Sequence, residues 1–364
     1  MEETILQMSN VVLKVSNLSI EYAGTNTVRA LNGGSLNLES GKITGIVGES
    51  GCGKTTLALA CIGLLPQNAK ILSGEIVFND QTIEMKSRTS FELLRGTGIS
   101  MIFQEPLSSL NPVYRSRYQL AEAIIARNKS AGHIPRSFTS HASRGPSRLK
   151  MMSSIFSRVK ITSQVRQEII DLLKAVRIND PDNVMQRYPH ELSGGMRQRV
   201  MIAMSLALRP DVLIADEPTT ALDVTTQAKV LALIRELSRE YNTAVALISH
   251  DLSVIAEASD RVQVMYLGEV VERSDADRIF NKPLHPYTVG LMGSFPTTWV
   301  DEDQLQPIPG LVPSLNAPPS GCRFHTRCPK AFGPCATVSP ELTTINESEV
   351  ACHLYGEGKS QSPS

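Results

Sequence analysis

Short, continuous apolar runs alternate with longer segments of helical periodicity over much of the chain. Buried strands are predicted at 42–47, 99–103, 211–216 and 244–249. Helices are predicted at 56–65, 119–127, 165–176, 196–208 and 225–241. Apolar runs of this length, bounded by turn residues, are typical of strands that are covered on both faces. Strands that alternate with helices in this way favour an α/β fold with a mostly parallel sheet.

A second pattern, in which apolar and polar residues alternate, indicates strands of another kind. It predicts a half-buried strand at 13–22, a returning strand and its neighbour at 27–38, and a further strand at 73–80. The segment 261–272 is predicted to be a closing hairpin with its turn at Gly268. These strands indicate an antiparallel β subdomain in addition to the main sheet.

Residues 48–56 fit the spacing G-x-x-x-x-G-K-[ST] of a phosphate-binding loop. A predicted strand precedes these residues and a predicted helix follows them. This strand–loop–helix context favours a phosphate-binding loop over the alternative, a glycine-rich turn that binds no ligand. The glycines of the loop allow successive N–H groups to point at an anion, and the helix N-terminus adds partial positive charge. Lys54 can reach the β- and γ-phosphates of a nucleotide, and the Thr55 hydroxyl can bind Mg²⁺.

Polar side chains follow three of the predicted buried strands. The carboxyl edge of the sheet, where these strands end, is the place where α/β proteins bind ligands. Asp216 can hold Mg²⁺ through water, and Glu217 can polarise a water for attack on a γ-phosphate. His250 can bond the γ-phosphate, and the amide oxygen of Gln104 can reach the metal or the water. An acidic turn and a surface glutamine are the alternative interpretations.

A second candidate anion site precedes the helix predicted at 196–208. Ser193 is a good N-cap residue, and Gly194 and Gly195 leave the N–H groups of the first turn uncovered. An open helix N-terminus beside a small hydroxyl attracts anions. This second anion site cannot also contact the phosphates held at Lys54 unless it approaches them from a different direction.

Composition excludes some classes of function. Lysine plus arginine and aspartate plus glutamate both number 36, so no net charge favours nucleic acid. No apolar run is long enough to span a bilayer and no signal peptide is recognisable, so a cytosolic location is expected. The segment 123–167 contains nine Lys or Arg residues and no acidic residue. It is predicted to be a solvated, partly disordered insertion or a basic arm that contacts acidic headgroups or a partner.

In their order, these motifs resemble those of the ATP-binding subunits of ABC transporters. The sequence Leu-Ser-Gly-Gly at 192–195 separates that family from other phosphate-loop ATPases, and Ala-Leu-Asp at 221–223 matches a further family loop. The resemblance implies that Tyr22 stacks on adenine; from the residues alone, a tyrosine at the edge of the core is the alternative. The ATP-binding residues that it implies are Tyr22, Gly48, Ser50, Gly51, Cys52, Gly53, Lys54, Thr55 and Thr56.

The resemblance also implies a division of roles. Glu217 is implied to be the general base, and His250 and Gln104 complete the hydrolytic site. The residues implied to bind Mg²⁺ are Thr55, Gln104 and Asp216. Two such domains pair head to tail in this family. The residues implied to contact the ATP of the partner are therefore Ser193, Gly194, Gly195 and Asp223.

Segments near the C-terminus resemble the dipeptide and oligopeptide importer group, notably His-Pro-Tyr-Thr at 285–288 and Pro-Gly-Leu-Val-Pro at 309–313. This resemblance implies a phosphate-loop ABC ATPase core and a small Cys-rich C-terminal extension. The implied boundaries are an ATPase domain at 11–280, a helical subdomain at about 105–205 with a basic insertion at about 128–163, and an extension at 281–357.

The implied function is ATP-driven import of dipeptides or oligopeptides from a position on the cytoplasmic face of the cell membrane. The implied partners are a second, paralogous ATPase subunit in a heterodimer, two transmembrane permease subunits and an extracellular solute-binding protein; nucleic acid is not expected. Relatives that carry oligosaccharides or nickel are alternatives. A soluble ABC ATPase that acts on ribosomes or nucleic acid is a further alternative.

Four cysteines in the extension have the spacing C-x₅-C-x₆-C-x₁₆-C; they are Cys322, Cys328, Cys335 and Cys352. In a reducing compartment such a group is more typical of metal binding than of disulfides. Structural zinc sites usually contain a closer pair, whereas four thiolates and a Cys-Pro step suit a [4Fe–4S] cluster. The family resemblance also implies that cluster; zinc and free or disulfide-bonded thiols are the alternatives. The cations expected to offset its negative charge, or to be solvated, are Arg323, Arg327 and Lys330.

Overall fold

The computed structural model describes residues 10–24, 26–85, 87–103, 110–130, 161–220, 222–294 and 308–355. Gln104, Ala221 and most of the predicted basic insertion at 128–163 lie outside these residues.

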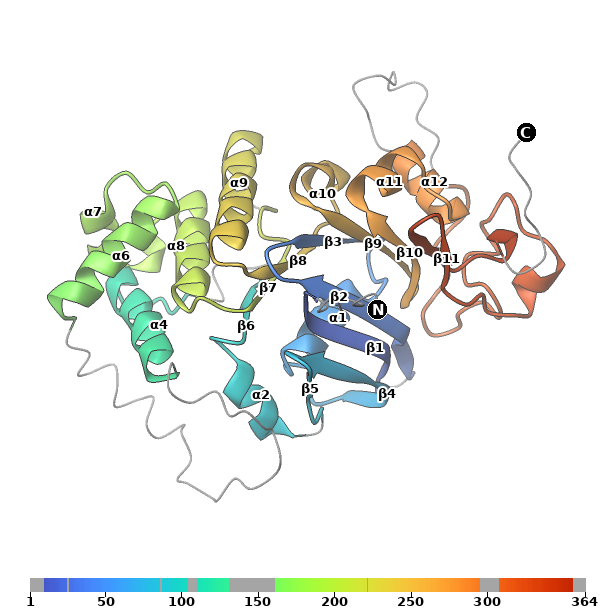
Figure 1. Cartoon of the computed structure of the whole chain (residues 1–364), viewed down its shortest axis with the longest axis horizontal. Coiled ribbons are helices and arrows are strands. Elements are labelled where there is room, and N and C mark those ends of the chain that lie inside the picture. The colour runs from blue at the N-terminus through green and yellow to red at the C-terminus, as the bar shows by residue number, and fades with distance from the viewer. Residues whose placement is uncertain are drawn as a thin grey trace, which may run out of the picture. The chain divides into compact units, whose positions relative to one another are not determined.

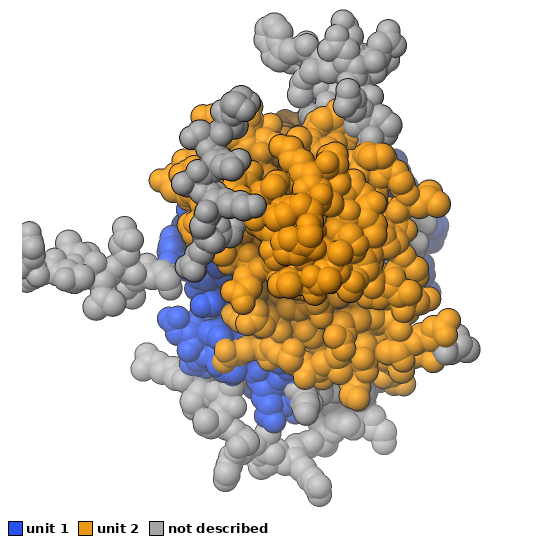
Figure 2. Space-filling view, turned by 90° about the vertical axis from the view of Figure 1, so that its right-hand side faces the viewer, with its two compact units in different colours: residues 1–14, 37–42, 76–245 blue, residues 15–36, 43–75, 246–364 orange. Residues whose placement is uncertain are grey.

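The chain divides into two compact units, which are interleaved in sequence (Figure 2). Unit 1 comprises Met1–Lys14, Asn37–Lys42 and Ile76–Val245. Unit 2 comprises Val15–Leu36, Ile43–Glu75 and Ala246–Ser364.

Unit 2 contains a mixed sheet. Its strands are, in spatial order, β11 (Thr343–Ile345), β12 (Ser348–Val350), β10 (Glu269–Asp275), β9 (Arg261–Tyr266) and β3 (Ile43–Val47). β3 runs parallel to β9, whereas β9, β10, β12 and β11 pair antiparallel (Figure 1). Every residue of β3 is buried, as the continuous apolar run predicts. The turn between β9 and β10 contains Gly268, so the predicted hairpin is confirmed.

Unit 1 contains the parallel pair β6 (Ile99–Ile102) and β7 (Val212–Asp216), in which Ile99 pairs with Val212 and Ile102 with Ala215. β8 (Ala244–Ile248) starts in unit 1 and continues into unit 2. All residues of these three strands are buried. The three buried strands predicted in this part of the chain are therefore confirmed.

All but α4 of the helices of unit 1 begin at a side chain that accepts a hydrogen bond from the first turn. These helices are α2 (Arg88–Leu94), α4 (Ser116–Ser130), α6 (Ser163–Ala175), α7 (Pro181–Gln186), α8 (Gly194–Ala207) and α9 (Val224–Glu240). The caps of α6, α8 and α9 are Thr162, Ser193 and Asp223. A side-chain oxygen at this position satisfies an N–H group that the helix itself leaves open. Helices α4, α6 and α8 pack on one another in the helical part of this unit (Figure 1).

A four-stranded sheet has the order β2 (Val28–Glu39), β1 (Val11–Tyr22), β4 (Ala69–Phe78) and β5 (Gln81–Thr82). β1, β2 and β4 each contain residues of both units. The prediction of two elements within 27–38 was wrong, because one strand runs from Val28 to Glu39.

The helix predicted at 56–65 also has different bounds, since α1 covers Lys54–Cys61. Gly63 adopts a φ of 64° and donates from its N–H group to the carbonyl of Ala60. Leu64 donates to the carbonyl of Leu59 at 2.8 Å. This left-handed C-terminal motif ends the helix before Pro66 is reached.

The C-terminal part of unit 2 adds α10 (Leu252–Ala258), α11 (Ala276–Asn281) and α12 (Pro286–Gly293). The buried carboxylate of Glu272 accepts hydrogen bonds from the N–H groups of Leu284 and His285, both at 2.8 Å. His285 Nδ1 in turn accepts from the N–H of Tyr287 at 3.0 Å and caps α12. Among the described residues, no helix combines the length and apolarity needed to cross a membrane.

Burial of His285 makes unit 2 sensitive to acid. Burial lowers the pKa of His285 to about 3, whereas an unfolded histidine has a pKa of about 6.5. Between these values the unfolded chain binds a proton that the folded chain does not, so stability falls as the pH decreases. We expect a loss of about 2 kcal/mol between pH 7 and pH 5, measured by urea unfolding.

His285→Asn is the matched control, because its amide oxygen can accept the same cap hydrogen bond and does not titrate. Burial raises the pKa of Glu272, which acts with the opposite sign, and both proteins retain that residue. The difference between the two pH profiles therefore reports His285. Parallel losses of stability in the two proteins would contradict the assignment.

Candidate functional site

The phosphate loop of unit 2 connects β3 to α1 and depends on glycine at close backbone contacts. Gly48 and Gly53 adopt φ values of 152° and 103°. A Cβ at Gly48 would lie 2.2 Å from the carbonyl oxygen of Met265, and one at Gly53 would lie 2.6 Å from that of Ala30. Because both obstacles are main-chain atoms, a side chain cannot be accommodated by a rotamer change. The shape of the loop is therefore set by the close packing of its backbone against the carbonyl groups of Met265 and Ala30.

Lys54 lies inside the curl of this loop. Its Nζ donates to the carbonyl oxygens of Gly48 at 2.6 Å and Glu49 at 3.2 Å, and lies 3.6 Å from the sulfur of Cys52. The side chain is 8% exposed. Burial raises the pKa of Cys52, and the charge of Lys54 acts against that rise. The ammonium group is thus held at the start of α1, where a phosphate is also favoured by the helix N-terminus.

Tyr22 and the hydroxyl residues of the motif lie at this loop. The Tyr22 hydroxyl and Thr56 Oγ1 are 3.1 Å apart and share a hydrogen bond. Ser50 and Thr55 are exposed. The structure therefore brings the predicted adenine-stacking residue to the phosphate loop and leaves the predicted Mg²⁺-binding hydroxyl accessible.

Two residues that contact the loop, Tyr287 and Arg327, were not predicted from the sequence to lie there. Glu49, the second residue of the loop, donates from its N–H group to the hydroxyl of Tyr287 at 3.0 Å. Its carboxylate is paired with Arg327 at 2.8 Å. Arg323 is paired with Glu269 at 2.8 Å. Both arginines are 7% exposed, so the expectation that they are solvated was wrong: each is paired with a carboxylate.

The two predicted partner-facing motifs lie together in unit 1. Ser193 Oγ accepts from the N–H of Met196 at 3.3 Å and caps α8, which confirms its predicted role as an N-cap. A Cβ added to Gly195 would lie 3.6 Å from side-chain carbons of Leu222 and Thr226. Asp223 Oδ1 accepts from the N–H of Thr226 at 3.0 Å, and hydrogen bonds to Thr226 lower the pKa of Asp223.

Next to Gly195, Gly194 is exposed, and a Cβ there would meet no atom within 4 Å. The N-terminus of α8 is therefore open on the side of Gly194.

Asp216 and Glu217 also belong to unit 1, at the end of β7. Asp216 is buried, and Glu217 is half-buried with a φ of 49°. The Thr220 hydroxyl donates to Glu217 Oε2 at 2.9 Å. Gln198 of α8 donates from Nε2 to the carbonyl of Pro218. Helix α8, which starts within the Leu-Ser-Gly-Gly signature at 192–195 (the signature helix), and the loop at 216–220 (the acidic loop) are thus joined by a hydrogen bond within the same unit.

His250 follows β8 in unit 2 and is exposed. Unit 2 therefore contains the phosphate loop, Tyr22 and His250, whereas unit 1 contains the signature residues, the two acids and Asp223.

The four cysteines of the extension lie in unit 2, and their thiols influence one another. The N–H of Cys322 donates to the carbonyl of Cys335 at 2.9 Å. Burial, with a contribution from the other three thiols, raises the pKa of Cys352 to about 11. All six cysteines are described and none forms a disulfide. Among the described residues, however, no group of three or more His, Cys, Asp or Glu side chains is arranged to hold a metal ion.

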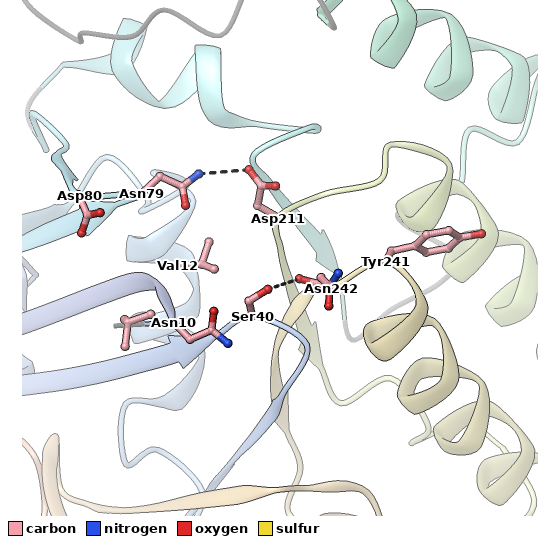
Figure 3. A pocket seen from close by; sticks show the side chains of 9 residues that line it. Asn10, Val12, Ser40, Asn79, Asp80, Asp211, Tyr241 and Asn242 are labelled. Carbon is pink, nitrogen blue, oxygen red and sulfur yellow. Dashed lines mark hydrogen bonds between the residues drawn. The ribbon is translucent and has the colours of Figure 1, made fainter. Parts of the chain in front are cut away.

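A polar pocket of about 380 Å³ lies elsewhere in unit 1 (Figure 3). It is lined by Asn10, Val11, Val12, Ser40, Asn79, Asp80, Asp211, Tyr241 and Asn242. Asn79 donates to Asp211 at 3.4 Å, and Ser40 donates to the carbonyl of Asn242 at 2.8 Å (Figure 3). Because these polar groups bond one another and none is a predicted site residue, this pocket is not the candidate site.

Comparison with known proteins identifies the family. A family model described as "ABC transporter" matches residues 31–220, and one described as "Oligopeptide/dipeptide transporter, C-terminal region" matches residues 271–335. The dipeptide transport ATP-binding protein DppD of Bacillus subtilis is 41% identical over 349 residues, which is 95% of this chain and 95% of the relative. The oligopeptide transport ATP-binding protein AppD of the same organism is 40% identical over 351 residues, 96% of this chain and 98% of the relative.

A dimeric bacterial ABC transporter cassette of known structure has the same fold, with a TM-score of 0.56 at 24% identity over 72% of this chain and 98% of the cassette. Fold, phosphate loop and acidic strand end together define a phosphate-loop ATPase. The chain belongs to the ABC transporter family, as an ATPase of that family.

The backbone contact at Gly48 predicts a specific sensitivity of the loop. Gly48→Ala should lower the free energy of unfolding by at least about 2 kcal/mol, because the new Cβ meets the Met265 carbonyl. Gly51→Ala is the matched control: Gly51 also has a positive φ, of 78°, but a Cβ there meets no atom within 4 Å. Thermal unfolding measures both variants. Equal losses would show that backbone strain, and not the contact with β9, decides the requirement for glycine.

Proposed function

We propose that this chain is the ATP-hydrolysing motor subunit of an importer for dipeptides or oligopeptides. The observation that carries the proposal is the combination, in one chain, of a complete set of ABC ATPase motifs with the C-terminal region of the oligopeptide/dipeptide transporter group. Relatives that align with nearly the whole chain are named as dipeptide and oligopeptide transport ATP-binding proteins. The proposed domain boundaries are an ATPase domain at 11–280 and an extension at 281–357.

In the proposed ATP site, Lys54 and the N–H groups of the loop bind the phosphates and Tyr22 stacks on adenine. The placement of both residues at the loop supports these roles. The other proposed ATP-binding residues are Gly48, Ser50, Gly51, Cys52, Gly53, Thr55 and Thr56.

Mg²⁺ is proposed to bind at Thr55, Asp216 and Gln104. The exposed hydroxyl of Thr55 and the buried carboxylate of Asp216 are oxygen donors of the kind that Mg²⁺ prefers. When bound, the ion neutralises charge on the phosphates. Glu217 is proposed to take the proton of the attacking water, with His250 and Gln104 completing the hydrolytic site. The hydrogen bond from Thr220 holds the Glu217 carboxylate in a defined place.

The proposed reaction requires a second ATPase subunit. Ser193, Gly194, Gly195 and Asp223 are proposed to contact the ATP held by that subunit, a paralogue with which this chain forms a heterodimer. The open N-terminus of α8 beside Gly194 suits an anion supplied from outside the chain. The solved cassette described above is dimeric. ATP drives closure only if it binds the closed pair more tightly than the open one.

Two permease subunits and an extracellular solute-binding protein are the remaining proposed partners, at the cytoplasmic face of the membrane. A surface pocket of about 330 Å³ in unit 1 suits contact with a permease. It is lined by Val113, Tyr114, Arg115, Arg117, Tyr118 and Tyr188. The Val113 side chain is 69% exposed, and Arg115 lies over the Tyr188 ring at 5.3 Å. The tyrosine and arginine side chains that line it are half-buried, and aromatic residues and arginine are enriched at protein interfaces.

We also propose that the extension binds a [4Fe–4S] cluster through Cys322, Cys328, Cys335 and Cys352, with zinc as the alternative. The support is the donor set: four free thiols that influence one another electrostatically. Such a cluster is held by four thiolates. Its proposed role is structural, as a link between the segments that carry the four cysteines.

The motor proposal is tested with Glu217→Gln in the complete importer complex. An amide cannot take a proton from water, so ATP turnover should fall by at least about 100-fold while ATP binding persists. ATP should then hold the two ATPase subunits together, which gel filtration with ATP can measure. Retained turnover would remove Glu217 from the role of base.

Cells that carry the same substitution should lose uptake of labelled dipeptides or oligopeptides. Uptake of labelled oligosaccharides and of nickel, measured in parallel, should be unchanged. A selective loss for either of these solutes would reassign the cargo. Co-purification of the unaltered chain with ribosomes instead of membranes would contradict the importer proposal.

The cluster proposal predicts about four iron and four sulfide ions per chain after purification without oxygen. Cys352→Ser should lower the iron content. Cys61→Ala is the control, because Cys61 is buried in α1 of the same unit and is not one of the four proposed ligands. Zinc in place of iron would establish the alternative metal, and neither metal would exclude both.

A further inference from the structure

Arg327, in the Cys-rich extension, reaches the phosphate loop although 278 residues separate it from Glu49. Its Nη1 and Nη2 donate to the two carboxylate oxygens of Glu49 at 2.8 and 3.1 Å. Nε donates to the carbonyl of Pro309 at 3.1 Å, and Nη1 also donates to the Tyr266 hydroxyl at 3.3 Å. The Arg327 side chain is 5% exposed. The position of the guanidinium is therefore set by the fold and not by solvent.

Glu49 connects this arginine to Lys54. The N–H group of Glu49 donates to the hydroxyl of buried Tyr287 at 3.0 Å. Its carbonyl oxygen accepts from Lys54 Nζ and from the N–H of Cys52, both at 3.2 Å. The carboxylate, the N–H group and the carbonyl oxygen of Glu49 therefore all form hydrogen bonds. A displacement of Glu49 would move an acceptor that holds the ammonium group of the phosphate loop.

Arg323 makes a second connection, through the turn between β9 and β10. Its Nη1 donates to the carbonyl of Leu267 at 2.6 Å, and its Nε lies 2.8 Å from Glu269 Oε1. Between these two residues, the N–H of Gly268 donates to the carbonyl of Cys52 at 2.9 Å. Arg323 therefore holds the turn to which the phosphate loop is bonded.

The two arginines belong to one short, ordered segment that begins at Cys322. The N–H of His325 donates to the carbonyl of Cys322 at 3.0 Å, and that of Arg327 to the carbonyl of Phe324 at 2.9 Å. Phe324 is 1% exposed, and its ring lies 5.3 Å from the rings of both Tyr266 and Tyr287. Buried aromatic packing of this kind fixes the segment in place.

We propose that Arg327 is a positioning residue of the ATPase reaction: through its ion pair with Glu49 it holds the phosphate loop in the shape that receives ATP. The proposal rests on the proposed ATP site and is independent of the proposed cluster. Replacement of Arg327 leaves the half-buried Glu49 carboxylate, 24% exposed, without its ion-pair partner, so the loop populates other shapes. ATP then binds only the competent fraction, and its apparent affinity falls by that fraction. Because ground state and transition state lose the same contact, KM rises while kcat changes little.

The test measures MgATP hydrolysis by the complete complex with Arg327→Gln in this chain. We expect KM for MgATP to rise about tenfold and kcat to stay within about threefold. Arg327→Lys should give an intermediate KM, since it keeps the charge and loses the two-pronged geometry. Glu49→Gln should act in the same direction, and the double variant with Arg327→Gln should be less than additive, because both changes break one interaction.

Arg273→Gln is the matched control. Arg273 forms a two-pronged ion pair with Glu349, at 2.7 and 2.6 Å, with side chains 18% and 29% exposed. This pair joins β10 to β12 in the same unit. Its loss should lower the unfolding temperature and leave KM unchanged.

An Arg327→Gln variant that only loses thermal stability, with the KM of the unaltered chain, would overturn the proposal. If that variant does not fold, the KM for MgATP is measured with Glu49→Gln instead. An unchanged KM in that variant would also overturn the proposal. A complex that does not hydrolyse ATP even with the unaltered chain would contradict the proposed function instead.

Discussion

The close approach of two pieces of backbone is the constraint on which the nucleotide site depends. The carbonyl of Met265, in β9, occupies the space that a side chain at position 48 would need, and the carbonyl of Ala30 does the same at positions 53 and 268. Main-chain atoms cannot rotate away as the end of a side chain can. The phosphate loop is therefore shaped from outside, by Ala30 in β2, which precedes it, and by Met265 in β9, which follows it by more than two hundred residues. It curls around the ammonium group of Lys54.

Charged residues of the extension reinforce this packing. Ion pairs on the surface, such as Arg166 with Asp182 at side-chain exposures of 54% and 63%, contribute at most about 1 kcal/mol. Removing one partner of a buried pair, by contrast, costs about 3–5 kcal/mol. Arg323 and Arg327 lie between these two cases: the arginine side chains are 8% and 5% exposed, and their partners Glu269 and Glu49 are 21% and 24% exposed. The extension is consequently part of the structure that supports the phosphate loop in unit 2.

The residues predicted to bind this chain's own ATP and those predicted to face a partner's ATP lie in different units. Unit 2 brings Tyr22 to the phosphate loop, and unit 1 brings the signature residues to the loop that ends at Asp223. The residues proposed to face another chain's nucleotide thus lie beside one another. Helix α8 connects them to the acidic loop through the hydrogen bond from Gln198 to the Pro218 carbonyl. Helix α8 is therefore joined directly to the loop that contains Glu217.

The sequence by itself determined the elements whose signals are local. Continuous apolar runs located β3, β7 and β8, Gly268 located the hairpin turn, and Ser193 located the start of α8, because each depends on residues within a few positions of one another. The phosphate-loop motif is contiguous and was recognisable for the same reason. Local signals also failed in two places: Gly63 ended α1 before Pro66, and β2 continued where two elements were expected.

Only the tertiary structure decided which side chains support the motif. Nothing near Glu49 in the sequence indicates Arg327, and nothing near Arg323 indicates Glu269, because an ion pair between distant residues has no period and no spacing rule. It exists only where the path of the chain brings two buried charges together, and there the low polarity of the surroundings requires that they pair.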